Sequence, residues 1–463
     1  MARPWIERER LTFPLTTLPL AMTRVDAPDF WRDRRMWIGF LVAALLESHN
    51  SVAYLVPALP LLPIKVIQWP AAAVKPLSGL GSLWTALYPF QIGITFLLPL
   101  DVSLSLWLFF LLTRVQDVGA VMLGFRDQGG WSLTLPPYHG AQNSGAVLML
   151  AVMLLWRIRG ELWDGLRGRR PTQRLALLGL AVSATGVCWL AANAGMPVGV
   201  VAVWLVLYLL VALTLGRLVA ESGIPTAMWP FPPQEILYAV TGSTILNRRQ
   251  LVAFTWLRNF DERYADTPIM HQLTAFRLWS ELRGEGSPPR PLSWRPMHAA
   301  LAVGAVVGIA GGLWALLHLY FTYGLATATT RQWPARDVAL GPWRYLQGLL
   351  DRPTGFDPAK VWGMVAGAAV MAALLFCRAR FAGFPVHPIG YAVAANWAMN
   401  EQWFPFLVGW VVKKVILKVG GIRLYRRSLP LFLGLILGDL VVPVLWAVVG
   451  VATGRQMYLA FPH

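Results

Sequence analysis

The sequence predicts an all-α protein, a polytopic membrane helix bundle with about seven full spans and two re-entrant hairpins. Hydrophobic residues make up 56% of the 463 residues and charged residues only 14%, whereas about a quarter of a soluble domain is charged. The run PVGVVAVWLVLYLLVALTLG, Pro197–Gly216, carries no charge and matches the ~20 helical residues that cross a bilayer. Because lipid cannot hydrogen-bond a bare backbone, and the runs show no strict alternation, we expect helical spans.

The net charge of +17 is explained by where the basic residues lie. Arginine clusters separate the apolar runs, which is typical of cytoplasmic loops and of contact with anionic lipid headgroups. No basic helix with interleaved stacking aromatic residues stands apart from these runs, so nucleic acid is not an expected partner. The expected partner is the lipid bilayer, and both a homo-oligomer and a larger membrane complex stay open.

The N-terminal segment, residues 1–35, predicts the orientation. It is rich in arginine and precedes the first apolar run, so the positive-inside rule places the N-terminus in the cytoplasm. The arginines are Arg3, Arg8, Arg10, Arg24, Arg32, Arg34 and Arg35. Further basic clusters at 157–174, 248–295, 378–380 and 413–427 are expected on the same side.

The complete spans follow from these clusters, within a single membrane domain, 1–463. The first helical group covers 36–220 and the second 296–463. The second span is short, and we expect it to begin near Tyr138. The predicted spans are Met36–Leu59, Gly145–Trp156, Leu175–Ala194, Pro197–Leu218, Met297–Tyr320, Val361–Cys377 and Leu429–Val451.

Two apolar stretches do not fit as full spans, and each is predicted to be a re-entrant hairpin. If 83–112 crossed fully, the arginines after Trp156 would fall on the wrong side. Pro99 and Asp101 lie near its centre, where proline breaks a helix into halves. The stretch 384–416 has basic clusters on both sides. One hairpin would enter from outside and the other from inside, as in inverted-repeat secondary transporters. Two extra short spans per hairpin are the alternative.

Two further patterns concern packing. Residues 221–295 are rich in proline and charge, and they predict a cytoplasmic-face platform of short helices lying on the membrane. Small residues spaced four apart predict close helix contacts at three places. These glycines are Gly304, Gly308 and Gly312, then Gly363 and Gly367, then Gly434 and Gly438.

Polar residues inside the hairpins form the candidate binding site, because an ionisable group at the bilayer centre costs roughly +2.5 kcal/mol or more. Asp101 lies at the predicted break of the first hairpin, with Gln91 nearby, and Asn396, Asn400 and Glu401 lie in the middle of the second. Unwound carbonyls and a carboxylate would there replace water around a substrate or ion. Asp101 could equally cap the helix that follows it.

Other intramembrane polar residues favour structural roles. Glu47, His49, His318 and Asp439 are more simply satisfied contacts within the bundle than members of a proton relay. Glu47 and His49 are two residues apart and do not share a helix face, which disfavours a metal held by both. Arg217 and Glu221 are spaced i, i+4 and predict a structural ion pair.

No enzyme signature is present. The sequence lacks His-Glu-x-x-His, a Walker-type phosphate loop, Gly-x-Ser-x-Gly and Cys-x-x-Cys-His. We therefore expect no enzyme activity, no catalytic residues, no metal site and no cofactor.

Several longer segments carry a family resemblance. They are ERERLTFPLTTLPLAM, WIGF, DVSLSLWLFFLL, RLVAESGIP, GFPVHPIGYAVAANWAM and YRRSLPLFLGLILGD, spread over most of the chain. The chain resembles a family of uncharacterised prokaryotic polytopic membrane proteins that is distantly similar to the oligopeptide transporter superfamily. This resemblance implies that the protein is located in a prokaryotic inner (plasma) membrane. Members of that family usually carry further helices before the segment resembling Trp5–Met22, so this chain looks shortened at its N-terminus.

Two functional hypotheses follow. The first is a secondary-transporter-like protein for a small polar or peptidic solute, coupled to protons or cations. The second is a non-catalytic structural subunit of a larger respiratory or photosynthetic membrane complex. The 23 Trp and 21 Phe residues suit the lipid-buried contacts that such a subunit would make.

Overall fold

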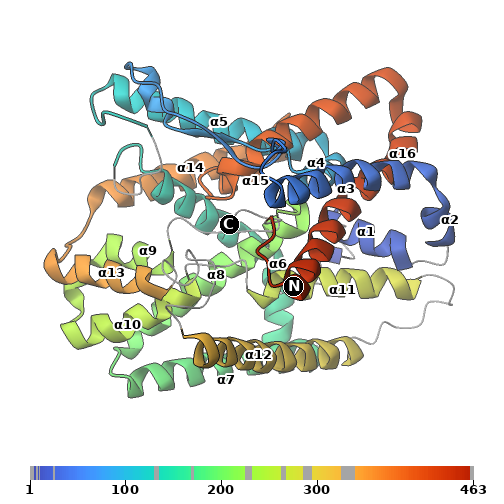
Figure 1. Cartoon of the computed structure of the whole chain (residues 1–463). Coiled ribbons are helices and arrows are strands. Elements are labelled where there is room, and N and C mark those ends of the chain that lie inside the picture. Colours follow the sequence, from blue (N-terminus) through green and yellow to red (C-terminus); the bar gives the residue numbers. More distant parts are fainter. Residues whose placement is uncertain are drawn as a thin grey trace.

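The computed structural model describes residues 5–6, 9, 11–23, 27–129, 135–167, 171–224, 232–261, 267–284, 295–324 and 339–458. Over these residues the chain forms the predicted all-α polytopic helix bundle (Figure 1). Its helices are α1 (Pro14–Thr23), α2 (Ala27–Arg32), α3 (Arg34–Leu55), α4 (Pro89–Leu97), α5 (Leu100–Met122), α6 (His139–Leu166), α7 (Pro171–Asn193), α8 (Val198–Ser222), α9 (Pro233–Thr241), α10 (Arg248–Asp261), α11 (Pro268–Gly284), α12 (Arg295–Tyr323), α13 (Ala339–Asp351), α14 (Pro358–Arg380), α15 (Pro388–Val393) and α16 (Met399–Thr453). Two short strands, β1 (Ile67–Trp69) and β2 (Leu83–Thr85), pair antiparallel.

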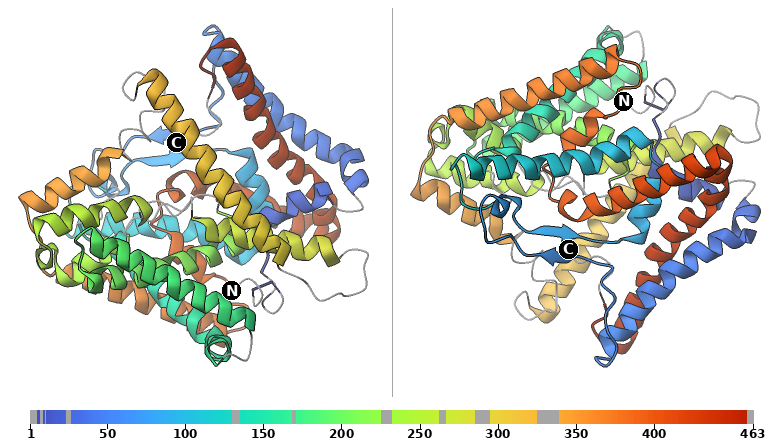
Figure 2. Two further views of the ribbon diagram at one scale, coloured as in Figure 1. Left: turned by 90° about the horizontal axis from the view of Figure 1, so that it is seen from below. Right: turned by 90° about the horizontal axis from the view of Figure 1, so that it is seen from above.

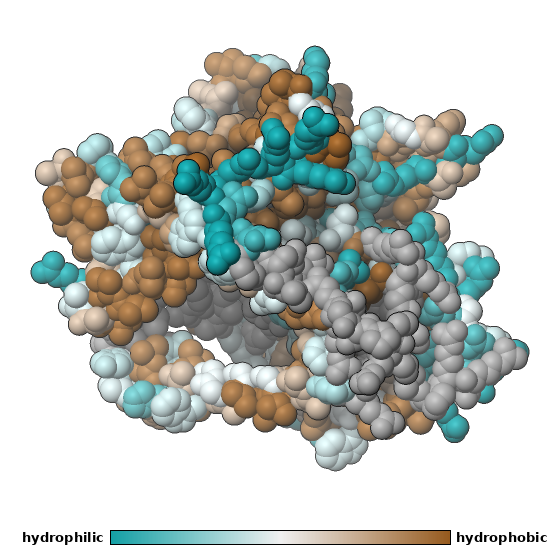
Figure 3. Space-filling model, turned by 90° about the vertical axis from the view of Figure 1, so that its right-hand side faces the viewer, coloured by the Kyte–Doolittle hydropathy of each residue, from teal (hydrophilic) through white to brown (hydrophobic). Residues whose placement is uncertain are grey.

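Seven helices in the described part of the chain are long and apolar enough to cross a membrane, which identifies an integral membrane protein. They are α3, α5, α7, α8, α12, α14 and α16. Large apolar side chains point outward from them; Val306 is 67% exposed and Trp362 71%. Figure 3 shows patches of hydrophobic side chains on one side of the molecule, with hydrophilic ones between them. Exposed apolar side chains in such numbers suit lipid rather than water.

α16 is a long element that bends at Gly421, whose φ of 57° is readily accessible to glycine. The bend divides it into a first arm (399–420) and a second arm (422–453). The second arm runs beside α3 (Figure 2). A Cβ atom on Gly434 would overlap the Met36 carbonyl oxygen, and one on Gly39 would overlap that of Leu431. Each glycine thus packs on the carbonyl that lies one turn before the other glycine.

The pair α6 and α14 repeats this contact. A Cβ atom on Gly145 would overlap the Met364 carbonyl oxygen, and one on Gly367 would overlap that of Gln142. Again each glycine packs on the carbonyl one turn before its counterpart, because small residues let two helices approach until their backbones touch. The close packing predicted for the glycines of α14 and of the second arm is confirmed.

Two hairpins complete the core, and each joins a short helix to a long one. In the first, α4 ends at Leu97 and α5 begins at Leu100, so the helix is broken at Pro99 as predicted. In the second, α15 ends at Val393 and the first arm begins at Met399. The two long helices cross antiparallel, since Arg114, Phe110 and Trp107 of α5 contact Asn400, Trp403 and Trp410 of the first arm in that order.

The short helix of each hairpin packs along the long helix of the other. α4 runs parallel to the first arm, since Thr95 lies against Gly409 and the Leu98 carbonyl accepts a 2.5 Å hydrogen bond from Lys413. The lysine charge at that helix end also offsets the dipole of α4. α15 runs parallel to α5 in the same manner. There, Ser105 accepts a 2.6 Å hydrogen bond from the backbone N–H of His387, and the rings of Phe109 and Tyr391 follow at 5.7 Å.

Both hairpins differ in extent from the predicted ranges 83–112 and 384–416. Residues 83–85 pair with β1 as a strand, and α5 continues past Leu112 to Met122. The apolar run ends near Arg114, but Arg114 is buried inside the bundle, so its charge does not end the helix. The first arm likewise continues past Ile416. Lys413, predicted to begin a cytoplasmic cluster, is buried against the end of α4.

The spans show two corrections. α5, predicted as part of a hairpin, is long and apolar enough to cross a membrane, whereas α6 is not among the seven such helices of the described residues. α6 contains the predicted short span and begins at His139, close to the expected start at Tyr138. α12 lies at an edge of the molecule (Figure 1), and 0% of its most apolar window is buried. Gly304, Gly308 and Gly312 have no atom within 4 Å of an added Cβ. The packing predicted for this glycine stripe is therefore not made within the described part of this chain.

The segment 221–295, predicted as a platform, contains the short helices α9, α10 and α11, while 225–231, 262–266 and 285–294 lie outside the described residues. α11 packs on α8, where Leu273 covers Gly216. Met270 and Leu273 are buried in the main apolar core. α11 is thus an integral part of the bundle's packing.

Candidate functional site

The residues predicted to form one central site lie in separate places. Asp101, in the first turn of α5, pairs with Arg378 at the end of α14, with 2.8 Å between Oδ2 and Nη2. Both side chains are partly exposed, 29% for Asp101 and 38% for Arg378. Asp101 therefore serves an ion pair that links α5 to α14.

Glu401 and Gln91 lie where α4 meets the first arm. The Tyr88 hydroxyl donates to Glu401 Oε2 at 3.4 Å. Burial, and then the charge of Glu401, raise the pKa of Tyr88 far above its usual range, so the phenol keeps its proton. Gln91 is fully buried, and neither its amide nitrogen nor its amide oxygen has a hydrogen-bond partner. A small polar group or a water molecule would relieve such an unsatisfied amide.

Asn396 lies in the turn before the first arm, and Asn400 lies at the start of that arm. Asn400 Oδ1 accepts a hydrogen bond from Arg114 Nη2 at 2.5 Å. Asp101 precedes Arg114 on α5 by 13 residues (114 − 101), which is about 20 Å along a helix axis. The structure therefore does not bring Asp101 together with Asn396 and Asn400.

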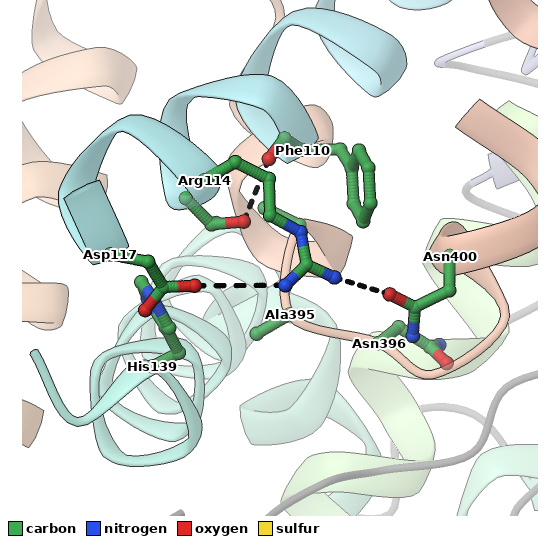
Figure 4. A pocket seen from close by; sticks show the side chains of 9 residues that line it. Phe110, Arg114, Asp117, His139, Ala395, Asn396 and Asn400 are labelled. Atoms are coloured by element: carbon green, nitrogen blue, oxygen red, sulfur yellow. Dashed lines mark hydrogen bonds and ion pairs between the residues drawn. The ribbon is translucent and has the colours of Figure 1, made fainter. Parts of the chain in front are cut away.

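Asn396 and Asn400 line a small cavity of about 10 Å³, the space of about one water molecule (Figure 4). A large cavity of about 230 Å³ adjoins it and shares four lining residues with it: Thr113, His139, Ala394 and Ala395. The two cavities lie between α5, α6 and the turn that follows α15. We call them the small cavity and the large cavity.

Asp117 organises the charges at the small cavity. Its Oδ1 accepts a hydrogen bond from Arg126 at 2.7 Å and lies 3.0 Å from His139 Nε2, while its Oδ2 lies 3.6 Å from Arg114 Nη1. Only 1% of the Asp117 side chain and 7% of the Arg114 side chain are exposed. One buried carboxylate thus faces two guanidinium groups and an imidazole.

Arg114 itself is incompletely satisfied. Besides its contacts to Asn400 and Asp117, it lies over the Phe110 ring at 5.0 Å from the centroid. Its buried Nε has no hydrogen-bond partner among the residues that the structure describes. Figure 4 shows the guanidinium held between Asp117 and Asn400 at the wall of the small cavity.

The large cavity has a mixed lining. Polar side chains come from Gln116, Gln142, Asn143 and Tyr391, and apolar ones from Phe109, Leu112 and Val370. Asn143 Nδ2 donates to the carbonyls of Tyr391 and Ala392 at 3.1 and 2.9 Å, whereas its buried Oδ1 has no partner. Burial raises the pKa of Tyr391 to about 12, so its hydroxyl stays protonated and donates to Gln142 Oε1 at 3.3 Å.

Sequence reasoning does not identify Arg114, Asp117 or His139 as site residues. Charged residues at the ends of apolar runs usually mark the membrane surface, and these three occur there. The available signal is the i, i+3 spacing of Arg114 and Asp117, which allows an ion pair on one face of α5.

A second buried polar cluster joins α3, α4 and the second arm. The side chains of Glu47 and Asp439, 3% and 4% exposed, interact electrostatically with each other. Asp439 Oδ2 accepts a hydrogen bond from the backbone N–H of Phe90 at 2.8 Å, and Glu47 Oε2 lies 3.3 Å from Lys65 Nζ. Two neighbouring buried carboxyl groups repel each other when both are ionised, and a proton on one of them removes that repulsion. The cluster is therefore chemically suited to bind and release a proton.

The other predicted intramembrane residues lie apart from both clusters. His49 Nε2 lies 3.0 Å from the Pro60 carbonyl oxygen, and His318 stacks on Trp314 with 5.6 Å between ring centroids. Within the described ranges, no three side chains of His, Cys, Asp or Glu gather in a way that would hold a metal ion.

The Arg217 and Glu221 side chains are in contact, as their spacing predicts, and they belong to a larger network. Arg217 also contacts Glu9, which ties the N-terminal segment to α8. His387 Nε2 faces Glu221 Oε2 at 3.6 Å. Burial, and then the charge of Arg378, lower the pKa of His387 to about 4, so its ring is neutral at neutral pH. Its Nδ1 accepts from the Ile389 N–H at 3.3 Å and caps α15.

Comparison with known proteins places the chain in a family. Residues 1–462 match a family of unknown function (DUF6785), and the chain belongs to that family. No curated protein matches the sequence. The membership agrees with the expected kinship to uncharacterised polytopic membrane proteins, and it assigns no activity.

Proposed function

We propose that the protein is a secondary transporter that moves a small polar or peptidic solute across the membrane. The observation that carries this proposal is the exchange of short helices between the two hairpins, with α4 along the first arm and α15 along α5. Each half of the chain also has the same order of elements: a long helix, a hairpin and a second long helix. One half is α3, the hairpin α4–α5 and α6; the other is α14, the hairpin of α15 with the first arm, and the second arm.

The two halves run in opposite directions. On α4, Phe90 and Gly93 meet Asp439 and Ile436 in turn, so α4 is antiparallel to the second arm. It is parallel to the first arm and therefore opposite to α5. The glycine contacts pair the first helix of each half with the last helix of the other. Inverted repeats with broken helices are a common architecture of secondary transporters, in which the breaks form the solute site.

The two adjoining cavities offer a place for the solute. They lie where the turn of one hairpin meets the long helix of the other, and they contain several polar groups in a partly apolar lining. Solute sites usually combine an apolar wall with a few well-placed polar groups. The sequence resemblance to oligopeptide transporters supports transport by analogy alone.

The Glu47–Asp439 cluster supports coupling to protons. It joins the hairpin helix α4 to the glycine-packed pair of α3 and the second arm through the Phe90–Asp439 hydrogen bond. A movement of the hairpins against that pair would change this hydrogen bond and, with it, the affinity of the cluster for its proton. Proton binding and hairpin movement would then be linked.

The test is uptake by the protein reconstituted in liposomes, with a panel of labelled amino acids and dipeptides and an imposed proton gradient. We expect Asp439→Asn to abolish accumulation driven by the gradient while leaving exchange of labelled for unlabelled solute, because exchange needs no net proton movement. The matched control is Asp33→Asn. Asp33 is partly exposed and caps α3, and asparagine caps equally well, so uptake should be unchanged.

Two results would contradict these expectations. Gradient-driven accumulation by Asp439→Asn at the wild-type rate rejects the coupling role of the Glu47–Asp439 cluster. A wild-type protein that moves none of the panel, with or without an ion gradient, rejects transport of small polar or peptidic solutes.

A second candidate function, a structural subunit of a larger membrane complex, is favoured by α12 alone. Its glycine stripe at Gly304, Gly308 and Gly312 meets no other described part of the chain, although such stripes usually pack on another helix. Purification from native membranes in mild detergent tests this candidate. A cysteine at Gly308 that forms cross-links to another protein would support it, and a protein that always migrates alone would exclude an obligate subunit.

A further inference from the structure

We propose that the small cavity binds a carboxylate group of a small solute through Arg114, while Asn143 accepts a hydrogen bond from an N–H or O–H of the same solute. This inference rests on the proposed transport function for the movement of that solute, but the binding itself can be measured separately. It names the chemical class of the solute, which the fold alone leaves open.

The first argument is charge. Asp117 faces Arg114, Arg126 and His139, and it lies closer to Arg126, at 2.7 Å, than to Arg114, at 3.6 Å. The guanidinium of Arg114 is therefore the less well neutralised of the two. A buried charge without a close counter-ion is costly, and an incoming anion would lower that cost.

The second argument is the unused hydrogen-bonding capacity of Arg114. A guanidinium presents five donors in a planar fork that matches a carboxylate. Arg114 uses its terminal nitrogens toward Asn400 and Asp117, and its buried Nε is without a partner. The small cavity on which it lies has room for about one water molecule, which is also the space of about one carboxylate oxygen.

The third argument comes from the large cavity and is independent of Arg114. Asn143 is fixed by two carbonyl oxygens that accept from its Nδ2, so the identity of its free atom as Oδ1 is settled. Oδ1 is buried without a partner, and Asn143 lines the large cavity. A solute with a donor group near its carboxylate would satisfy Asn143 and Arg114 together. At about 230 Å³ the large cavity suits a smaller solute than the about 300–1,000 Å³ pockets of drug-sized ligands.

The test is direct binding to the full-length protein in lipid nanodiscs, in a buffer free of carboxylates and low in chloride. The probes are acetate with its uncharged counterpart acetamide, and L-alanine with alaninamide. Isothermal titration calorimetry gives the dissociation constant, and the unfolding temperature gives a second readout. We expect the dissociation constant of each carboxylate to be lower than that of its amide by about tenfold or more. We also expect L-alanine to bind more tightly than acetate.

Two variants locate the site. Arg114→Gln should weaken carboxylate binding by about tenfold or more, because it removes the charge-assisted hydrogen bonds. Since Arg114 also contacts Asp117 and Asn400, this variant could fail to fold. Ala395→Leu therefore provides the second test: Ala395 lines both cavities, so leucine fills them while every charged residue stays in place. Carboxylate binding should be lost there as well.

Several outcomes would overturn the inference. They are equal affinity for carboxylates and amides, no binding of any carboxylate, chloride binding as tight as that of the carboxylates, or full binding in Ala395→Leu. Failure of the inference and failure of the proposed function are distinguishable. Solute uptake without carboxylate binding would reject the inference alone, and carboxylate binding without uptake of the bound solute would reject transport alone.

Discussion

Asp117→Asn should destabilise the folded protein by about 3–5 kcal/mol, because it leaves buried positive charge without its counter-ion. The asparagine keeps the size of the side chain but cannot neutralise Arg114 and Arg126, which lie 3.6 and 2.7 Å from the carboxylate oxygens. The measurement is the unfolding temperature in detergent, together with the fraction of protein that elutes as a folded species.

Asp127 is the matched control for this change, since it lies ten residues further along the same region (127 − 117). It pairs with Lys75 at 2.7 Å, but its side chain is 92% exposed. Lys75 lowers the pKa of Asp127 through a solvated contact, which adds little to stability. Asp127→Asn should leave the unfolding temperature unchanged. Equal unfolding temperatures for the two variants would contradict the view that Asp117 balances buried charge.

A double variant separates charge from packing at this site. Arg126→Gln added to Asp117→Asn removes one of the two guanidinium groups that face residue 117, so it should recover part of the lost stability. If Asp117 mattered only for its shape, the second substitution would cause a further loss instead.

The sequence is sufficient to predict the first break and six of the seven spanning helices of the described residues; the exception is α5, predicted as part of a hairpin. Long uncharged runs predict membrane helices with little alternative. Pro99 has no backbone N–H to donate, so it interrupts the helix whatever the helix packs against. These features depend on residues close together in the chain. The positions of α8 and α14, and the end of α4 just before Pro99, could therefore be predicted from composition and spacing alone.

The composition of the site could not be predicted in the same way. The apolar runs are interrupted by Asp101, Asn400 and Glu401. This pattern indicates that a polar group is buried, but it does not identify the residue that the group contacts. The partner depends on how two helices cross, which decides that Asp101 meets Arg378 and Asn400 meets Arg114. Arg114 also resembles a residue at the membrane surface, because only the fold shows that its charge is covered.

Two glycine stripes with the same four-residue spacing differ in whether they pack on another helix. Gly308 and Gly434 both occur in apolar helices with a second glycine four residues away. Spacing therefore predicts close packing for both. The structure places a backbone carbonyl against Gly434 and no atom within 4 Å of a Cβ added at Gly308. The difference lies in the partner helix, which the local sequence does not contain.

This contrast gives the second large expected effect. Gly434→Ala should destabilise the bundle by about 3 kcal/mol, because its methyl group would overlap the Met36 carbonyl oxygen, and a backbone atom cannot move aside as a flexible side chain can. Gly308→Ala is the matched control. In open space the same change should be neutral or stabilising by up to about 1 kcal/mol, since alanine is the better helix former.

The comparison extends to both halves of the chain. Gly39, Gly145 and Gly367 make the contacts that correspond to that of Gly434, so alanine at each should lower the unfolding temperature by a similar amount. Similar losses at all four positions would support two oppositely directed halves held by equivalent helix pairs. A loss in only one pair would show that the halves are not equivalent in energy, and an effect of Gly434→Ala no larger than that of Gly308→Ala would contradict the backbone contact itself. Because unfolding is measured without any solute, this result tests the architecture independently of transport.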